Sequence, residues 1–270
     1  MDKVSIAFIG GGNMAQALIG GLIAAGHPAA RIRVADPGQA VREQVATEFG
    51  VQVGAANIDA AKNARVVVLA VKPQVMPDVL KALADELVPG TLVISVAAGV
   101  TLDRLRAGLG SGVRLVRAMP NTPALFSVGM TGLVAGPDVD QDSRSLATEI
   151  LGCVGQTVWL EQEALIDVVT AVSGSGPAYF FALAEQLALA GQNAGLPPAV
   201  AAQLARQTAF GAGTMLARSE HSAGELRARV TSPGGTTQAA LEAFEQGDFS
   251  RLVQAAVDAA VRRGRELGEN

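Results

Sequence analysis

The chain has 270 residues, which is more than one average domain and predicts two domains or one domain with a large appendage. Its formal net charge of −4 and its pI near 5.3, without any basic cluster, argue against nucleic acid as a partner. Hydrophobic residues make up 49% of the chain, but charged and strongly polar residues interrupt every long apolar run, so no membrane span is predicted.

The first predicted elements lie in Val4–Ala25, where an apolar run, a glycine cluster and apolar residues at helical spacing predict strand, tight turn and helix. Gly10, Gly12 and Ala15 fill the pattern G-x-G-x-x-A of a dinucleotide-binding turn. In that pattern the first glycine permits the turn, the second lets a pyrophosphate approach, and the small third residue packs helix on strand. Asp36 ends the next apolar run, where such folds place an acid beside the adenosine ribose. An ordinary strand-to-helix turn is the alternative.

Apolar runs alternate with helical periodicity through the first 160 residues. Runs such as VVVLAV and TLVISV are apolar on both faces, as a parallel sheet covered by helices requires. This region is therefore predicted to be a Rossmann-type, doubly wound α/β sheet. Its later strands are predicted at 31–36, 51–53, 64–71, 91–96, 113–119, 130–134 and 156–160, and its helices at 39–49, 77–87, 102–109 and 143–155.

Three motifs follow predicted strands and are expected to border the ligand crevice, because ligands bind outside the carboxyl ends of parallel strands. Ala70–Pro73 ends one strand, and Lys72 could point over a cofactor or substrate or be a solvated lysine at a loop entry. Ser95–Gly99 and Arg117–Pro123 follow two others, and their small residues and prolines would keep the crevice floor narrow. Asn121, between two prolines, could hydrogen-bond a nicotinamide carboxamide or cap a turn.

After residue 160 no strand is predicted and helical spacing continues, so an all-α domain follows the sheet, with domains at 1–160 and 161–270. Apolar positions on these helices are too extensive for a small bundle to cover alone, which predicts an oligomer interface. A tighter monomeric bundle is the alternative. The helices are predicted at 163–172, 177–194, 198–217, 223–230, 236–246 and 249–267.

Two stretches interrupt this helical pattern with small residues and a proline, namely Val172–Tyr179 (VSGSGPAY) and Thr231–Thr237 (TSPGGTT). Each is expected to start a helix with exposed backbone amides and hydroxyls, because proline is tolerated at a first helical position. Such a helix N-terminus binds a carboxylate well. Ordinary capping by Ser or Thr is the alternative for either stretch alone.

The remaining reactive side chains are few. Cys153 is the only cysteine, so an intrachain disulfide is impossible, and its apolar helical setting predicts a buried, inert thiol. His27, expected at the surface, and His221, expected to be structural, are the only histidines, so a histidine-based dehydrogenase mechanism fits poorly. No pattern of metal ligands occurs. The apolar run after Lys3 is too short for a signal peptide, which leaves the cytoplasm as the expected location.

Six motifs of this chain, in their order and at their intervals, resemble those of pyrroline-5-carboxylate reductases. They are IGGGNMA, AVKP, SVAAGVT, RAMPNTPA, VSGSGPAY and VTSPGGTT. The similarity extends from Lys3 to Leu267, and SGSGPAY with SPGGTT is its most specific part. The resemblance implies a Rossmann domain, a helical dimerisation domain that interleaves with its twin, and a ring of dimers. It also implies reduction of (S)-1-pyrroline-5-carboxylate to L-proline with NADPH or NADH, the last step of proline biosynthesis.

The resemblance further implies roles for individual residues. The candidate catalytic residues are Thr237, which would contact the imine nitrogen, Lys72, and Glu220, which could equally be a solvated residue at a helix end. Cofactor contacts are expected from Gly10, Gly12, Asn13, Met14, Asp36, Asn57, Val71, Lys72, Pro73, Ala97, Ala98, Gly99, Met119, Pro120 and Asn121. Substrate contacts are expected from Ser173, Ser232, Gly234, Gly235, Thr236 and Thr237.

This set of residues suits imine reduction. Hydride adds to a carbon that is activated by protonation of the adjacent nitrogen, so orientation, carboxylate recognition and one hydrogen-bonding group are enough. One alternative is another NAD(P)-dependent imine or hydroxy-acid reductase, although the helices at 163–217 carry no lysine for alcohol proton transfer. The other is a non-catalytic dinucleotide-sensing protein, which would not need the SPGGTT stretch.

The cofactor is expected to be NADPH, with NADH used better than by typical members of the family. Asp36 favours NADH, because a carboxylate accepts hydrogen bonds from the ribose 2′-hydroxyl and repels a 2′-phosphate. Arg42 could offset that charge.

Overall fold

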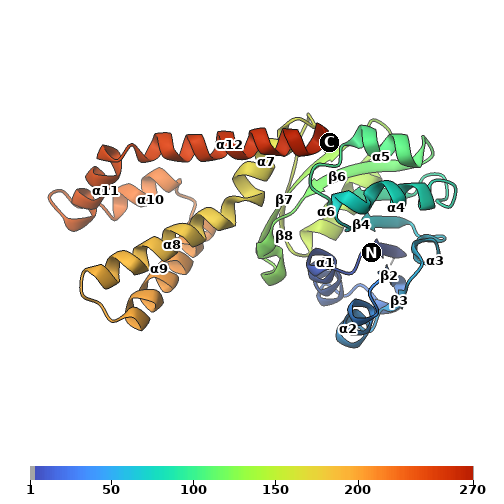
Figure 1. Cartoon of the computed structure of the whole chain (residues 1–270), viewed down its shortest axis with the longest axis horizontal. Coiled ribbons are helices and arrows are strands. Elements are labelled where there is room, and N and C mark those ends of the chain that lie inside the picture. Colours follow the sequence, from blue (N-terminus) through green and yellow to red (C-terminus); the bar gives the residue numbers. More distant parts are fainter. Residues whose placement is uncertain (1–3, 270) are drawn as a thin grey trace. The chain divides into compact units, whose positions relative to one another are not determined.

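The computed structural model describes residues 4–269, and its N-terminal half is built on an eight-stranded sheet (Figure 1). The strands are β1 (Ile6–Ile9), β2 (Ile32–Ala35), β3 (Gln52–Gly54), β4 (Val66–Leu69), β5 (Leu92–Ser95), β6 (Arg114–Met119), β7 (Gly129–Ala135) and β8 (Gly155–Trp159). Their order is β3-β2-β1-β4-β5-β6-β7-β8. β1 to β6 are parallel, β7 is antiparallel to β6, and β8 is parallel to β7.

Helices cover both faces of this sheet, because successive residues of a strand point to opposite faces and both sets are apolar. The helices are α1 (Asn13–Ala24), α2 (Gln39–Phe49), α3 (Asn57–Ala61), α4 (Met76–Leu83), α5 (Leu102–Leu109) and α6 (Gln141–Gly152). Ile6 and Phe8 of β1 belong to the core that contains α1, α2 and α6. Ala7 and Ile9 belong to the core that contains α3, α4 and α5. The predicted doubly wound sheet is confirmed.

Three helices of this half differ from the prediction. α3 was not predicted, because five residues are too few for a helical pattern to emerge. α4 ends at Leu83 rather than at residue 87, since a tight turn in which Glu86 N–H donates to the Leu83 carbonyl leads into Pro89. α6 begins at Gln141, because Oδ1 of Asp140 caps it by accepting from Ser143 N–H at 2.9 Å.

α6 also ends earlier than residue 155, and Cys153 follows its last residue. The Cys153 thiol is half-buried and donates to the Glu149 carbonyl at 3.2 Å. Burial, helped by the Glu149 carboxylate, raises the pKa of this thiol. A protonated thiol is a poor nucleophile, which agrees with the inert role predicted for Cys153.

The expectation that His27 lies at the surface is wrong, since only 5% of this residue is exposed. Gly26, at φ +87°, turns the chain back at the end of α1, and His27 N–H donates to the Leu22 carbonyl at 2.9 Å. This is the closure of a Schellman motif, in which the residue after the glycine packs against the helix it has just left. The motif therefore draws the imidazole inward.

Helices make up the remainder of the chain. They are α7 (Leu165–Val169), the π-helical turn η4 (Thr170–Gly174), α8 (Gly176–Asn193), α9 (Pro198–Arg218), α10 (Ala223–Arg229), α11 (Thr236–Gln246) and α12 (Phe249–Glu269). The 3-10 turns η1 (Ala29–Arg31), η2 (Pro73–Val75) and η3 (Thr122–Phe126) occur in the sheet half. α8 and α9 lie side by side as a hairpin (Figure 1). The predicted succession of helices is confirmed.

The described residues divide into two compact units. The first combines the chain up to Ser175 with the last turns of α12 from Ala260 on, and the second is Gly176–Ala259. One continuous helical segment, Leu165–Asn193, is long and apolar enough to cross a membrane by length and composition alone. It contains Asp167 and Glu185, and a long helix that packs against other protein meets the same criterion.

Candidate active site

The turn between β1 and α1 requires a glycine at its first position. Gly10 has φ +98°, and a Cβ atom there would lie 2.6 Å from the carbonyl oxygen of Ala70. No side chain tolerates that approach, so the end of β4 can pass here only because residue 10 lacks one. The Gly10 amide also donates to the Ala35 carbonyl at 2.7 Å. The predicted tight turn is confirmed, and it joins the ends of β1, β2 and β4.

Gly12 lies in open surroundings at the same turn. It is the N-cap of α1 with φ −71°, and a Cβ atom there would meet nothing within 4 Å. Asn13 is exposed, Met14 is half-buried against the core, and the first turn of α1 carries no acidic side chain. A helix N-terminus with open space before it and no acid in its first turn fits an anionic diphosphate.

Two backbone amides hold the carboxylate of Asp36 directly after β2. Oδ2 accepts from Gly11 N–H at 2.9 Å, and Oδ1 accepts from Gly38 N–H at 2.8 Å. Arg42 turns back to the same loop, where Nη1 donates to the carbonyl oxygens of Asp36 and Pro37 at 2.8 and 2.9 Å. The carboxylate is therefore fixed beside the glycine turn, and the Arg42 guanidinium lies at the same strand end.

The end of β4 supplies the next candidates. Val71 is half-buried, and its Cγ1 lies 3.1 Å from the position that a Cβ of Gly10 would take. Lys72 has an extended backbone, as the residue before Pro73 must, and its side chain is exposed. Asn57 is half-buried at the start of α3, which follows the edge strand β3.

The loop after β5 is narrow and closely packed. The buried hydroxyl of Ser95 accepts from Ala97 N–H at 3.4 Å, and Ala97 is itself buried while Ala98 is exposed. Gly99 has φ +75°, and a Cβ atom there would lie 3.1 Å from the carbonyl oxygen of Leu267. The last turn of α12 therefore packs against this loop within the first unit.

The end of β6 contacts the π-helical turn. The Asn121 amide Nδ2 donates to the backbone carbonyl of Ser173 at 3.1 Å and to its hydroxyl at 3.3 Å. Asn121 Oδ1 accepts from Met130 N–H at 2.9 Å. A Cβ atom on Gly174 would lie 2.8 Å from Cε of Met119. Two motifs far apart in the sequence thus meet, and the Asn121 side chain joins them instead of capping its own turn.

The expected helix start at Val172–Tyr179 is only partly correct. α8 does begin at Gly176, but the preceding residues form η4 and Ser175 keeps right-handed helical dihedrals. Ser175 N–H donates to the Thr170 carbonyl at 2.7 Å, so a π-type turn uses this amide. The small residues of this stretch leave room for the extra residue that a π-type turn inserts into a nearly continuous helix. Ser173, in this turn, faces Asn121.

The second glycine-rich stretch does start a helix, in the second unit. Gly235 is the N-cap of α11, and Gly234 has φ +70°. The Gly235 amide donates to the Ser232 carbonyl at 3.0 Å. Thr236 is exposed and Thr237 is half-buried in the first turn. Such an N-terminus, with two hydroxyls beside its amides, can bind a carboxylate.

Glu220 and His221 lie in the bend between α9 and α10. Glu220 is exposed, and the half-buried His221 donates its N–H to the Ser219 hydroxyl at 3.1 Å. Ser222 then forms a capping box with Glu225 at the start of α10. Hydrogen bonds from Ser222 hold the pKa of the Glu225 carboxyl below its usual value. Glu220 is thus an exposed residue just before this capping box.

Comparison with known proteins identifies the family. Residues 163–267 match the family model for pyrroline-5-carboxylate reductase dimerisation, and residues 5–99 match that for coenzyme F420-dependent NADP oxidoreductase. The chain is 49% identical to a pyrroline-5-carboxylate reductase of Pseudomonas aeruginosa over 269 residues. The match covers 100% of this chain and 98% of that protein. The chain belongs to the pyrroline-5-carboxylate reductase family.

Solved structures of pyrroline-5-carboxylate reductases match this chain along its whole length. The Coxiella burnetii enzyme matches with a TM-score of 0.96 at 42% identity, and all of both chains is covered. The Plasmodium falciparum enzyme, solved with NADP bound, matches with a TM-score of 0.86 at 28% identity over 99% of both chains. The family resemblance in the sequence is confirmed, and the chain is an NAD(P)H-dependent oxidoreductase.

Within residues 4–269 of this reductase, no group of three or more His, Cys, Asp or Glu side chains could hold a metal ion.

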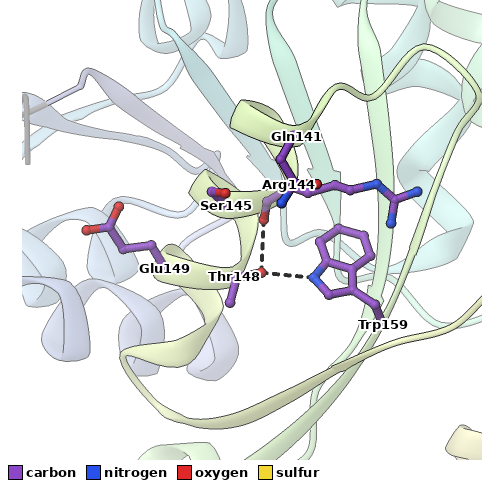
Figure 2. Close-up of a pocket in the computed structure, with 6 residues that line it drawn as sticks. All are labelled: Gln141, Arg144, Ser145, Thr148, Glu149 and Trp159. Carbon is purple, nitrogen blue, oxygen red and sulfur yellow. Dashed lines mark hydrogen bonds between the residues drawn. The ribbon is translucent and has the colours of Figure 1, made fainter.

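A shallow hollow outside the predicted site lies between α6 and Trp159 and has a volume of about 560 Å³ (Figure 2). The Trp159 indole donates to the Thr148 hydroxyl there at 2.9 Å. The Arg144 guanidinium lies 4.8 Å from the Trp159 ring centre. Since β8 is an edge strand with four strands between it and β1, this hollow is not part of the glycine-turn crevice.

Sequence reasoning missed a cluster of one buried arginine and two partly buried acids beside the β6 end of this reductase. Arg117 is 5% exposed, and its Nη1 lies 2.8 Å from Oε1 of Glu163, while Nη2 lies 3.8 Å from Oδ1 of Asp167. The same Glu163 oxygen accepts from Leu102 N–H at 2.8 Å, at the start of α5. An arginine inside an apolar strand must find partners, so the run RLVRAM could have predicted such a cluster.

Proposed function

We propose that this chain reduces (S)-1-pyrroline-5-carboxylate to L-proline at the expense of NADPH or NADH. Family membership along the whole length is the observation that carries the proposal. A fixed glycine turn and the separate glycine-rich start of α11 support it, because the reaction needs a diphosphate site and a carboxylate site. The proposed division of labour is cofactor binding in residues 1–160, and dimerisation and substrate binding in residues 161–270.

A bound dinucleotide would supply a hydride to the carbon of the protonated imine, and the C=N electron pair would then become the lone pair of the secondary amine. The diphosphate would lie in the open space at Gly12, beside the exposed residue Asn13 at the N-terminus of α1. Gly10 keeps β4 close, and the ends of β4, β5 and β6 would line the nicotinamide side. The proposed lining residues are Val71, Lys72, Pro73, Ala97, Ala98, Gly99, Met119, Pro120 and Asn121.

The α11 N-terminus would hold the substrate. Amides at the start of a helix stabilise an anion, so the loop of Ser232, Gly234 and Gly235 with Thr236 would bind the substrate carboxylate. Thr237 sits in the same first turn, and its hydroxyl would hydrogen-bond the ring nitrogen. Lys72 and Glu220 are further proposed catalytic residues, and Ser173 is a proposed substrate contact.

The proposed cofactor is NADPH, with appreciable use of NADH. Asp36 is held by two amides and can still accept a bond from a ribose 2′-hydroxyl, while its charge opposes a 2′-phosphate. The Arg42 guanidinium, which bonds the backbone carbonyl of Asp36, would offset part of that charge. The balance between the two side chains would set the preference.

The proposed assembly is a homodimer, with dimers arranged in a ring. Large apolar side chains are exposed along the second unit, among them Phe180, Phe181 and Phe210 at 65%, 68% and 68%. Exposed apolar surface of this extent marks an interface. The proposed location is the cytoplasm, with no nucleic-acid or membrane partner. A chain with a single cysteine suits that reducing compartment.

The test is oxidation of NADPH and NADH by the purified protein, followed by absorbance, with pyrroline-5-carboxylate as substrate. We expect substrate-dependent turnover with L-proline as the product, identified by chromatography. A 2-oxo acid and a hydroxy acid serve as comparison substrates. Turnover only with these would overturn the proposal in favour of a hydroxy-acid reductase, and binding of the dinucleotide without any turnover would favour a sensing protein.

A further inference from the structure

The third residue of α11 makes an unusual contact with the loop before the helix. Oε1 of Gln238 accepts from the backbone N–H of Gly234 at 2.8 Å. A glutamine at this position commonly reaches back to the amide of the N-cap residue as half of a capping box. Here the N-cap is Gly235, which has no side chain to complete the box, and Gln238 reaches one residue further.

A second bond fixes the orientation of the Gln238 side chain. Its Nε2 donates to Oε1 of Glu242, one turn later, at 2.8 Å. Because the NH₂ group is used in this way, the amide oxygen must be the atom that faces Gly234. Donation to a carboxylate also makes the amide oxygen a better acceptor, so the two bonds strengthen each other.

Packing does not hold the backbone of Gly234. Its φ of +70° is left-handed, the residue is exposed, and a Cβ atom there would meet nothing within 4 Å. A glycine in open space loses much conformational freedom when it is fixed. Two hydrogen bonds restrain this turn, from Gly234 to Gln238 and from Gly235 to the Ser232 carbonyl. Gln238 therefore supplies the side-chain restraint on this loop.

We infer that Gln238 is a positioning residue that presets the Ser232–Thr237 loop for a carboxylate, an inference that rests on the proposed function. With Gly234 fixed, the amides of Thr236, Thr237 and Gln238 remain as the first-turn donors that a helix leaves without intrahelical partners. A neutral acceptor matters here, because a glutamate at residue 238 would still satisfy Gly234 but would bring a negative charge next to an anion site. Gln238 thus sets the affinity for the acid group of the substrate and leaves hydride transfer unaffected.

The test compares steady-state kinetics of three variants with the wild type. Gln238→Met removes the acceptor but keeps the length and helix-forming tendency of the side chain, so we expect KM for pyrroline-5-carboxylate to rise about 3- to 10-fold. The value of kcat should stay within about twofold. Gln238→Glu keeps the acceptor and adds charge, so its KM should rise by at least about 10-fold at low salt and recover as ionic strength increases.

The matched control is Gln254→Met in α12. Gln254 Nε2 also bonds an acid one turn later, Oδ1 of Asp258 at 2.9 Å, but its position is within a helix and not beside a loop. We expect its kinetics to equal those of the wild type. If the wild type turns over and Gln238→Met keeps its KM, Gln238 is an ordinary helix-end residue and the inference fails alone. A wild type without turnover would overturn the proposed function, and this inference with it.

Discussion

Two glycines of the β1–α1 turn differ in what a methyl group would do to them. Gly10→Ala places Cβ 2.6 Å from the Ala70 carbonyl oxygen in a left-handed backbone, so we expect a loss on the order of 3 kcal/mol in the free energy of unfolding. Urea denaturation at one protein concentration measures this loss. Gly12→Ala, the matched variant, meets open space and should lose at most about 1 kcal/mol.

The variants Gly10→Ala and Gly12→Ala also separate an effect on folding stability from an effect on cofactor binding. Because the Cβ of Gly12→Ala would occupy the space proposed for the diphosphate, KM for the dinucleotide should rise by about tenfold or more while the fold is retained. Unchanged cofactor affinity in Gly12→Ala would place the diphosphate elsewhere. A Gly10→Ala protein as stable as the wild type would show that the end of β4 can move away.

The Thr237 hydroxyl is expected to act on the substrate nitrogen. A hydrogen bond to a charged partner contributes about 1.5–3 kcal/mol, so Thr237→Ala should lower kcat/KM roughly 10- to 100-fold. Folding should survive at a cost of about 1 kcal/mol at most, which thermal melting would measure. Thr236→Ala is the comparison variant and should affect substrate KM more than kcat. Wild-type efficiency in a folded Thr237→Ala protein would mean that this hydroxyl only caps the helix.

Asp36 is expected to limit the preference for NADPH. Since its carboxylate is fixed at the strand end, Asp36→Asn should raise the ratio of kcat/KM with NADPH to that with NADH about tenfold. Glu43→Gln removes an exposed charge on α2, where the carboxylate accepts from Gln39 Nε2, and it should leave the ratio unchanged. A wild-type preference for NADPH above about a thousandfold, roughly 4 kcal/mol, would contradict this role.

At the scale of secondary structure, two helix caps make the free energy of unfolding depend on pH in the acid range. Hydrogen bonds from Ser143 and Ser222 lower the pKa values of the Asp140 and Glu225 carboxyls from 3.8 and 4.5. Their contribution is therefore complete above the unfolded-state values and is lost as pH falls through the lower folded-state values. Asp140→Ala and Glu225→Ala should melt below the wild type near neutral pH, and the difference in Tm should shrink below about pH 4. A difference that stays constant across this range would rule out the caps as its source.

At the scale of the whole molecule, the exposed apolar helices predict assembly. Phe180 and Phe181 on α8 and Phe210 on α9 are each about two-thirds exposed, which a stable monomer would not retain. Size-exclusion chromatography with light scattering should therefore find a dimer or a larger assembly at micromolar concentration. A stable, active monomer under these conditions would refute the proposed interface, and with it the proposal that residues 161–270 drive dimerisation.

Local patterns in the sequence determined the architecture of this protein. Apolar runs of sheet period and helical period identified the doubly wound sheet, and helices such as α2, α5 and α11 began and ended where the pattern and the turn residues predicted. The glycine turn at Gly10 and the helix start at Thr236 were predictable for the same reason. Each depends on the allowed backbone angles and hydrogen bonds of a few consecutive residues.

Tertiary structure alone decided which side chains became partners. Asn121 and Ser173 are 52 positions apart, and Arg117 and Glu163 are 46 apart, so no local pattern relates them. Backbone periodicity is set by neighbouring residues, whereas a polar side chain takes whichever partner the completed packing brings within hydrogen-bonding distance.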